Sequence, residues 1–305
     1  MNIIESCGLG RRFGRTWALR DCSMAIPAGH VVALVGPNGA GKTTLLNLAA
    51  GLLQPTSGRL TVLAGEQPGS AQARNRIGFV AQDAKLYAHL PVGDMLRVAR
   101  NLNQTWDGDR ARARLADLGI PLDRKVRQLS GGQRAQLALT IAVAKRPEVL
   151  ILDEPLAALD PLARHDLMSS LMAAVVEDGL SVVFSSHVVS ELERIADYLV
   201  VLNNGRLQLA GEVEHLLARH KILTGPGGEM FVDSQRIAIV HAQQAGAQAH
   251  LLVRTSAAED PVPHGWQSQS ASLEELVLGY LRDPGARMLP GPAVATAGGA
   301  RAVTP

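Results

Sequence analysis

Short apolar runs alternate with stretches of helical pattern along much of this chain. The runs at residues 30–35, 147–152 and 181–186 are rich in valine, isoleucine and leucine. Such runs between turn signals are typical of strands buried on both faces of a parallel sheet. Helical patterns follow them, at residues 44–50, 134–146 and 161–174. The alternation predicts an α/β fold.

Shorter apolar segments complete the pattern over the first 222 residues. Asn203, Asn204 and Gly205 form a strong turn signal between two of these segments, which predicts a closing hairpin. A short helix is expected at residues 212–220. The remaining expected strands lie at residues 2–7, 18–26, 59–63, 76–80, 198–202 and 206–210.

Residues 85–128 have a different character. Apolar residues recur there at helical spacing, with arginine and aspartate between them, and Pro91, Gly108 and Pro121 interrupt the pattern. We interpret this segment as a helical insertion into the α/β fold.

The composition changes again from Gly225 onward. Residues 230–255 contain three possible strands, MFVD, RIAIV and HLLVRT, and residues 273–281 read as a helix. Beyond Pro284 the chain is mostly proline, glycine and alanine, so we expect a disordered tail. The predicted domains are residues 1–222, with a helical subdomain at about 85–142, a small α+β region at 223–284 and a tail at 285–305.

The first candidate site is a glycine-rich loop between a predicted strand and helix. Residues 36–43 read GPNGAGKT, which fits the P-loop pattern G-x-x-x-x-G-K-[ST]. Gly36, Gly39 and Gly41 allow the backbone to approach a phosphate closely. Lys42 adds a positive charge, and the Thr43 hydroxyl is a candidate ligand for Mg²⁺.

Two acids end the predicted strand at residues 147–152. Asp153 is placed to hold Mg²⁺, and Glu154 to orient or deprotonate a water molecule, a role worth roughly 10²–10⁴-fold in rate. The alternative is that these acids cap the next helix. His187 ends the following strand, on the side of a parallel sheet where ligands bind, and is a candidate partner for a γ-phosphate.

A second helix start also has the chemistry of an anion site. Residues 129–133 read LSGGQ and open a helix. A second such end suggests a nucleotide held from two sides. The alternative is a simple helix cap with Ser130 as the N-cap residue.

Three further side chains are candidates near the phosphates. Phe13 lies in a predicted turn close to the first strands, and its ring is able to stack on adenine, with Trp17 as the competing candidate. Either ring could instead serve only in packing. Gln82 follows a predicted strand, where it could reach a metal or a water molecule.

Composition and charge exclude several classes of protein. The 305 residues carry a formal net charge of +2, which gives no bulk electrostatic argument for nucleic-acid binding. Cys7 and Cys22 have no metal-ligand spacing, and a reduced compartment is expected. No apolar run approaches the roughly 18 residues of a membrane helix, and residues 1–14 lack the apolar core of a signal peptide.

The order of these motifs resembles the nucleotide-binding subunit of ATP-binding cassette (ABC) transporters. GPNGAGKT, Gln82, LSGGQ, VLILDE, LAALD and SSH follow one another over about residues 2–222, and LSGGQ with the acidic strand about 16 residues later is characteristic of that family. The resemblance implies a P-loop NTPase fold with a RecA-like core sheet, an antiparallel β subdomain and an inserted helical subdomain. ATP and Mg²⁺ are the implied cofactors.

The resemblance also implies a role for each candidate residue. Catalysis falls to Glu154, His187 and Gln82, and the metal to Thr43, Gln82 and Asp153. Asp160 is a contact across a dimer, although the LAA before it departs from the Ser, Thr or Gly of many members. The implied nucleotide-binding residues are Phe13, Gly36, Pro37, Asn38, Gly39, Ala40, Gly41, Lys42, Thr43, Thr44, Ser130, Gly131, Gly132, Gln133 and Asp160.

The implied partners are a separate transmembrane permease and a second ATPase subunit, identical or different, at the cytoplasmic face of the membrane. Residues 272–281, SLEELVLGYL, resemble the closing helix of drug-, polysaccharide- and antibiotic-type exporter ATPases, which favours export. Two alternatives remain: a soluble ABC ATPase acting on ribosomes or DNA, and a cassette that binds ATP without turnover. About 87 residues without a heptad repeat separate Lys42 from Leu129, which argues against a DNA-repair member. Intact Lys42, Asp153, Glu154 and His187 argue against a degenerate cassette.

Overall fold

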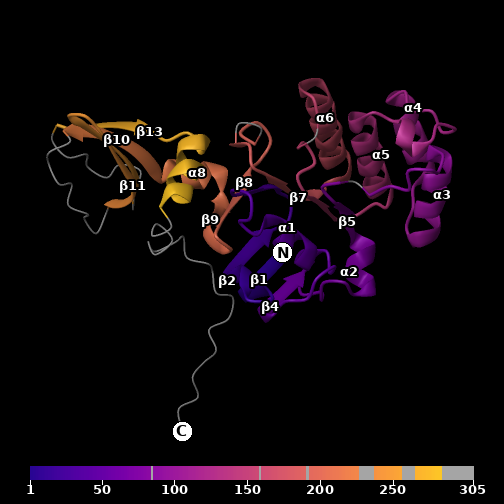
Figure 1. Ribbon diagram of the computed structural model, residues 1–305, viewed down its shortest axis with the longest axis horizontal. Coiled ribbons are helices and arrows are strands. Elements are labelled where there is room, and N and C mark those ends of the chain that lie inside the picture. The colour runs from indigo at the N-terminus through magenta and orange to yellow at the C-terminus, as the bar shows by residue number, and fades with distance from the viewer. Residues whose placement is uncertain (84, 158, 190–191, 227–236, 256–264, 284–305) are drawn as a thin grey trace, which may run out of the picture.

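A six-stranded sheet forms the centre of the molecule (Figure 1). The computed structural model describes residues 1–83, 85–157, 159–189, 192–226, 237–255 and 265–283. Five neighbouring strands of the sheet are parallel, and the last strand, β9, is antiparallel to β8. In sheet order the strands are β5 (Ile77–Val80), β6 (Val149–Leu152), β7 (Ser181–Ser186), β3 (Val31–Val35), β8 (Tyr198–Asn203) and β9 (Arg206–Glu212).

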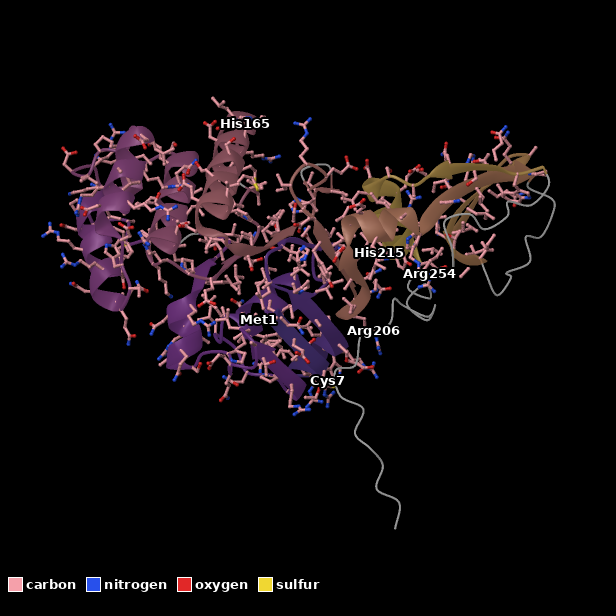
Figure 2. The ribbon with its side chains drawn as sticks, turned by 180° about the vertical axis from the view of Figure 1, so that it is seen from behind. Met1, Cys7, His165, Arg206, His215 and Arg254 are labelled. Atoms are coloured by element: carbon pink, nitrogen blue, oxygen red, sulfur yellow. The ribbon has the colours of Figure 1, made fainter. Side chains whose placement is uncertain are left out.

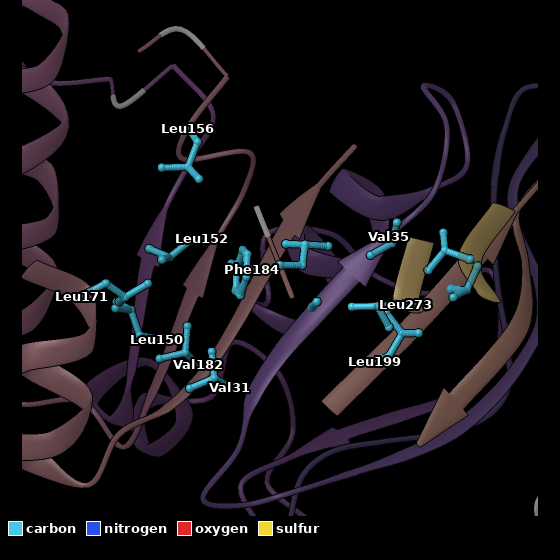
Figure 3. Packing of buried hydrophobic residues seen from close by; sticks show 14 of the residues in the cluster. Val31, Val35, Leu150, Leu152, Leu156, Leu171, Val182, Phe184, Leu199 and Leu273 are labelled. Atoms are coloured by element: carbon cyan, nitrogen blue, oxygen red, sulfur yellow. The ribbon is translucent and has the colours of Figure 1, made fainter. Parts of the chain in front are cut away.

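Both faces of this sheet are buried, which explains the continuous apolar runs. Val31, Ala33 and Val35 of β3 belong to one hydrophobic cluster, whereas Val32 and Leu34 belong to another. Successive side chains of a strand point to opposite faces, so a strand covered on both sides needs apolar residues at every position. Figure 3 shows the first cluster, which reaches from helix to helix across the sheet.

Different elements cover the two faces. The cluster that holds Val35 also takes side chains from α5 (Gly131–Ala144), α6 (Pro161–Asp178) and α8 (Leu273–Arg282). The opposite cluster packs α1 (Lys42–Ala49) and a three-stranded antiparallel sheet. This sheet is built from β1 (Asn2–Phe13), β2 (Thr16–Pro27) and β4 (Ser57–Val62). The expected α/β P-loop fold is confirmed.

The segment interpreted as a helical insertion forms its own small core. It contains α3 (Val92–Leu102), α4 (Gly108–Asp117) and a 3₁₀ turn at Val126–Gln128. Val92, Leu96, Leu115 and Leu129 pack together there with residues of α5. The helices are shorter than the predicted 85–128 stretch, because they begin after Pro91 and break between Leu102 and Gly108.

The N-terminal hairpin is longer than its apolar pattern predicts. The expected strands 2–7 and 18–26 extend to Phe13 and back to Thr16, so Phe13 ends a strand and does not lie in a wide turn. Register shifts interrupt the ladder between Ser6 and Leu9 and again near Arg11. These bulges break the two-residue periodicity on which the prediction depended. A short helix, α2 (Ala71–Arg76), was also not predicted.

The C-terminal region adds a second antiparallel sheet, at the opposite end of the molecule from α3 and α4 (Figure 1). Its order is β11 (Ile237–Ala245), β12 (Gln248–Thr255), β10 (His220–Pro226) and β13 (Gln267–Ser270). The predicted strands RIAIV and HLLVRT are present, whereas β10 and the wholly polar β13 were missed. The predicted strand MFVD and the expected disordered tail lie outside the described residues.

The C-terminal sheet is joined to the central sheet through α7 (Val213–Ala218) and α8. Leu273, Leu276, Val277 and Tyr280 of α8 belong to the core cluster of the central sheet, and Figure 3 shows Leu273 beside Leu199 of β8. Among the described residues, no helix is long and apolar enough to cross a membrane. Cys7 is exposed at the three-stranded sheet (Figure 2) and Cys22 is buried, and both are free thiols.

Candidate functional site

The loop GPNGAGKT connects β3 to α1 and is packed tightly between two other strands. An added Cβ at Gly36 would lie 2.3 Å from the Leu202 carbonyl oxygen of β8, and one at Gly41 would lie 2.5 Å from the Ala18 carbonyl oxygen of β2. Gly41 also has a φ of 103°, in the left-handed region that favours glycine. Both glycines are therefore required by the packing of the loop.

The loop ends where α1 begins, with Gly41 as the N-cap residue. No side chain among the described residues caps this end. The first N–H groups of a helix have no partner within the helix and favour a negative charge. This end of α1 therefore has the chemistry of an anion site, and Lys42 stands in its first turn.

Lys42 is buried, with 4% of its surface exposed. Its Nζ donates hydrogen bonds to the carbonyl oxygens of Gly36 at 2.8 Å and of Pro37 at 3.2 Å. The same atom lies 3.4 Å from Glu154 Oε1. The ammonium group thus joins the last part of the loop to its first two residues, and it also connects the loop to the end of β6.

Asp153 is buried at the end of β6 and faces the start of α1. Thr43 Oγ1 donates a hydrogen bond to Asp153 Oδ1 at 3.2 Å. Ser185 Oγ donates to the same oxygen at 2.7 Å. A hydroxyl and a carboxylate side by side form an oxygen donor set of the kind that Mg²⁺ prefers.

Glu154 adopts a backbone conformation that is rare for a side chain of its size. Its φ is 45°, and its backbone N–H donates to Ser185 Oγ at 2.7 Å. One carboxylate oxygen pairs with Lys42, and the other lies 3.3 Å from His187 Nδ1. Strained backbone of this kind persists where the surroundings hold it and is concentrated at functional sites.

Sequence reasoning missed Ser185 as a site residue. Its hydroxyl bonds both the Asp153 side chain and the Glu154 backbone, so it positions the two acids together. The signal was available, because Ser185 follows the apolar centre of a buried strand and lies two positions before His187. A fully buried hydroxyl must find a partner, and acids ending the neighbouring strand supply one.

The LSGGQ segment is built differently. Ser130 caps α5 by accepting a hydrogen bond from Gln133 N at 3.1 Å, and Gln133 Oε1 accepts one from Ser130 N at 3.1 Å. Ser130 is exposed. An added Cβ at Gly132 would lie 2.9 Å from the Cβ of Ala163, so this end of α5 is in close contact with the start of α6. The cap expected as an alternative is present, and it leaves the helix N-terminus facing solvent.

Asp160 occupies the corresponding place on α6. It is the N-cap residue of that helix, and its side chain accepts a hydrogen bond from Ala163 N at 3.0 Å. Because Ala163 also contacts Gly132, the starts of α5 and α6 form one surface. The polar contacts that position Ser130, Gln133 and Asp160 are local to their own helices.

The two aromatic candidates differ in their surroundings. Trp17 is 38% exposed, and its ring would lie 2.9 Å from a Cβ added at Gly10, so it packs across β1. Phe13 is 47% exposed, with the guanidinium carbon of Arg11 4.7 Å from its ring centre. Phe13 is therefore the more exposed of the two rings, at the end of the hairpin whose second strand packs on the P-loop.

Gln82 is exposed and lies two residues beyond the end of β5. Val80, two residues earlier, accepts a hydrogen bond from Asp153 N at 2.9 Å through its carbonyl oxygen. The end of β5 is therefore attached to the acid that faces Thr43. Ala81 lines a cleft of about 700 Å³ between the ends of α1 and α2 and the helices α3 and α5.

The sequence and the fold both match known proteins. Residues 19–157 match the family model described as ABC transporter. A structure of cbiO1 from Clostridium perfringens, part of the ABC transporter complex cbiONQ, is 30% identical, with a TM-score of 0.60, over 71% of this chain and 91% of that one. This chain belongs to the ATP-binding cassette (ABC) transporter family.

Relatives of this chain include proteins named for sulfate/thiosulfate import. The sulfate/thiosulfate import ATP-binding protein CysA of Synechococcus elongatus is 39% identical over 216 residues, which are 68% of this chain and 62% of that protein. Its namesake from Escherichia coli K12 is 37% identical over 217 residues, 68% and 59% of the two chains. The chain thus spans about six tenths of the length of these relatives.

A further solved structure illustrates a dimeric state within the family. It is described as a dimeric structure of a post-hydrolysis state of the ATP-binding cassette MJ0796 bound to ADP and Pi. Its TM-score is 0.60 and its identity 25%, over 69% of this chain and 98% of that one.

Proposed function

We propose that this protein binds ATP with Mg²⁺ and hydrolyses it to drive a separate membrane permease. The observation that carries the proposal is the convergence of Lys42, Glu154 and His187 in one connected set of contacts at the carboxyl edge of the parallel strands. Ligands of open α/β sheets bind at this edge. A buried lysine beside an uncapped helix start supplies the positive field that a triphosphate requires.

Asp153 and Glu154 have different roles in the proposed reaction. Thr43 and Asp153 hold the metal, which when bound neutralises charge on the phosphate oxygens. Glu154 orients the attacking water and accepts its proton while the bond between the γ-phosphorus and the bridging oxygen breaks, giving ADP and phosphate. His187 lies on the far side of the Glu154 carboxylate from Lys42, where it holds that carboxylate and a γ-phosphate oxygen in one geometry.

The contacts with adenine and the further contacts with the phosphates come from other parts of the molecule. Phe13 stacks on adenine, because its ring is the more exposed of the two candidate aromatic rings. Residues 130–133 and Asp160 contact the ATP held by a second subunit, identical or different. Their exposed, solvent-facing helix start supports this arrangement, since it lies outside the connected set of Lys42 contacts.

The permease docks at the cleft beside Gln82. That cleft has apolar walls from Phe79 and Ile141 and basic groups from Arg74 and Lys145. Gln82 follows its wall at Ala81 and is joined through β5 to Asp153, so it connects the docked permease to the metal. The protein then acts at the cytoplasmic face of a membrane.

The direction of transport is a separate question. The closing helix predicts export, whereas the relatives named above are import proteins. The proposal here is the ATP-driven permease, and export stays a prediction. A soluble ABC ATPase acting on ribosomes or DNA is the competing function.

Two measurements test the proposal. Glu154→Gln is expected to retain ATP binding and to lose at least about 100-fold in hydrolysis, because the amide cannot accept a proton from water. Glu214→Gln, at an acid in the first turn of α7, is the matched control and should retain wild-type hydrolysis. Unchanged hydrolysis in Glu154→Gln would refute the assignment of the base.

The partner is identified by purifying the tagged protein from detergent-solubilised membranes. A polytopic membrane protein recovered in about a one-to-one ratio supports the transport function. Recovery of ribosomes or DNA-bound proteins alone contradicts transport and leaves the ATPase chemistry standing. Vesicles reconstituted with the recovered partner then give the direction of transport.

A further inference from the structure

Residues on both sides of the turn between β8 and β9 contact the P-loop. The Leu202 carbonyl oxygen lies against Gly36, at a distance that leaves no room for a Cβ. On the other side of the turn, Gly205 N donates a hydrogen bond to the Ala40 carbonyl oxygen at 3.1 Å. A displacement of this turn would therefore move the first and the middle residues of the loop together.

The residue between these two contacts reaches in the opposite direction. Asn203 is 6% exposed, and its Nδ2 donates a hydrogen bond to the Leu281 carbonyl oxygen at 2.8 Å. Leu281 is in the last turn of α8, where carbonyl groups lack partners within the helix. Asn203 thus satisfies the end of the C-terminal helix from a position next to the phosphate loop.

A second polar contact holds α8 at a different place. The Tyr280 hydroxyl lies 2.9 Å from His220 Nε2, and His220 Nδ1 lies 2.6 Å from the Leu216 carbonyl oxygen. These partners belong to α7 and the start of β10 and not to the β8–β9 turn. The Tyr280 contact therefore holds the helix without involving the β8–β9 turn, whereas the Asn203 contact connects the helix to the turn beside the loop.

We propose that Asn203 is a positioning residue that couples the C-terminal helix α8 to the P-loop, so that nucleotide binding and the seating of α8 favour each other. The inference rests on the proposed function, because it needs nucleotide at the loop. Its physical basis is that the turn has backbone contacts with the loop on both sides of Asn203 and cannot follow α8 without moving the loop. Coupling of this kind is reciprocal by thermodynamic necessity.

The test compares two variants that each remove a polar anchor of α8, one beside the P-loop and one away from it. Asn203→Ala removes the contact beside the loop, and Tyr280→Phe removes the hydroxyl that contacts His220 and Arg254. Affinity for MgADP is measured by titration with a fluorescent analogue. Asn203→Ala is expected to weaken binding about fivefold or more, and Tyr280→Phe to leave it within about twofold.

Hydrogen exchange gives the reciprocal measurement. MgADP is expected to slow amide exchange in residues 273–282 of the wild type and of Tyr280→Phe, and to have no such effect in Asn203→Ala. Equal affinities in the two variants, or exchange in α8 that does not respond to MgADP in the wild type, would overturn the inference. If Asn203→Ala does not fold, the exchange measurement on the wild type is used alone. Exchange in α8 that does not respond to MgADP still overturns the inference.

The outcomes separate this inference from the proposed function. A wild-type protein that binds no nucleotide refutes both. A protein that binds MgADP normally, with α8 unaffected, refutes the coupling alone.

Discussion

The two halves of the candidate nucleotide site are built in contrasting ways. The half around Lys42 and Asp153 is buried and is held by contacts between residues far apart in the sequence, such as Thr43 with Asp153 and Ser185 with Asp153. The half around Ser130 is exposed and is held by a capping box within four residues. The first half is positioned by tertiary contacts within the chain. The second half is held by hydrogen bonds within its own helix start, and that helix start is exposed, as expected of a surface that contacts another molecule.

Mixing two inactive variants tests this contrast most strongly. Lys42→Ala and Ser130→Ala are each expected to lose most hydrolysis as homodimers. A mixed dimer would retain one site with Lys42 from one subunit and Ser130 from the other. At equal mixing, about half of the dimers are mixed and each has one of two sites, so about a quarter of wild-type hydrolysis should return.

The readout is the ATPase rate as a function of mixing ratio. The control is each variant alone, at the same total protein concentration as the mixture. If mixing restores nothing, the two halves do not come from different subunits, or the two sites of the dimer are not equivalent.

Ser185→Ala sharpens the comparison from within the buried half. Hydrogen bonds to charged groups contribute roughly 1.5–3 kcal/mol, so kcat should fall about tenfold or more as Asp153 and Glu154 lose their common partner. Ser186→Ala is the matched control, since the Ser186 hydroxyl bonds the local backbone at Val188. Equal rates in both variants would remove Ser185 from the site.

His220 and Tyr280 form a buried polar pair outside the nucleotide site. This pair tests whether a buried tertiary contact affects stability without taking part in function. Desolvation lowers the pKa of His220 to about 4, with Arg254 and Arg219 also disfavouring its charged form, while the Tyr280 hydroxyl faces its Nε2. Because the ordinary value is 6.5, His220 takes up a proton more readily in the unfolded chain. Its contribution to stability is present above about pH 6.5 and is lost as the pH falls toward 4.

Urea unfolding at pH 7.5 and pH 5 measures this effect. The wild type should lose about 2 kcal/mol of unfolding free energy through His220, and His220→Gln should lose correspondingly less over the same interval. Identical pH dependence in the two proteins would contradict the assignment.

The smallest expected effect separates capping from function. Ser130 and Ser272 both form capping boxes, at the starts of α5 and α8. Replacing either by alanine should cost about 1 kcal/mol of unfolding free energy. Only Ser130→Ala should also abolish hydrolysis. Normal hydrolysis in that variant would leave Ser130 as a cap alone.

Motifs whose function lies in a short stretch were predictable from the sequence. The strand, glycine loop and helix around Lys42 are local, and so are the acids that end β6 and His187 after β7. The parallel sheet followed from apolar runs, since doubly covered strands need apolar residues throughout. Elements without such patterning were missed, including the polar edge strand β13 and the bulged extension of β1 to Phe13.

The sequence by itself determined the α/β fold, the P-loop and the identities of the acids, because each depends on residue types at fixed local spacing. Only the tertiary structure decided that Ser185 joins Asp153 and Glu154, that Glu154 lies between Lys42 and His187, and that Asn203 connects the loop to α8. The side-chain contacts among these join residues between about 30 and 110 positions apart, and the backbone contacts between the Asn203 turn and the loop span about 165. Their geometry depends on how strands align in the sheet, which no local pattern encodes.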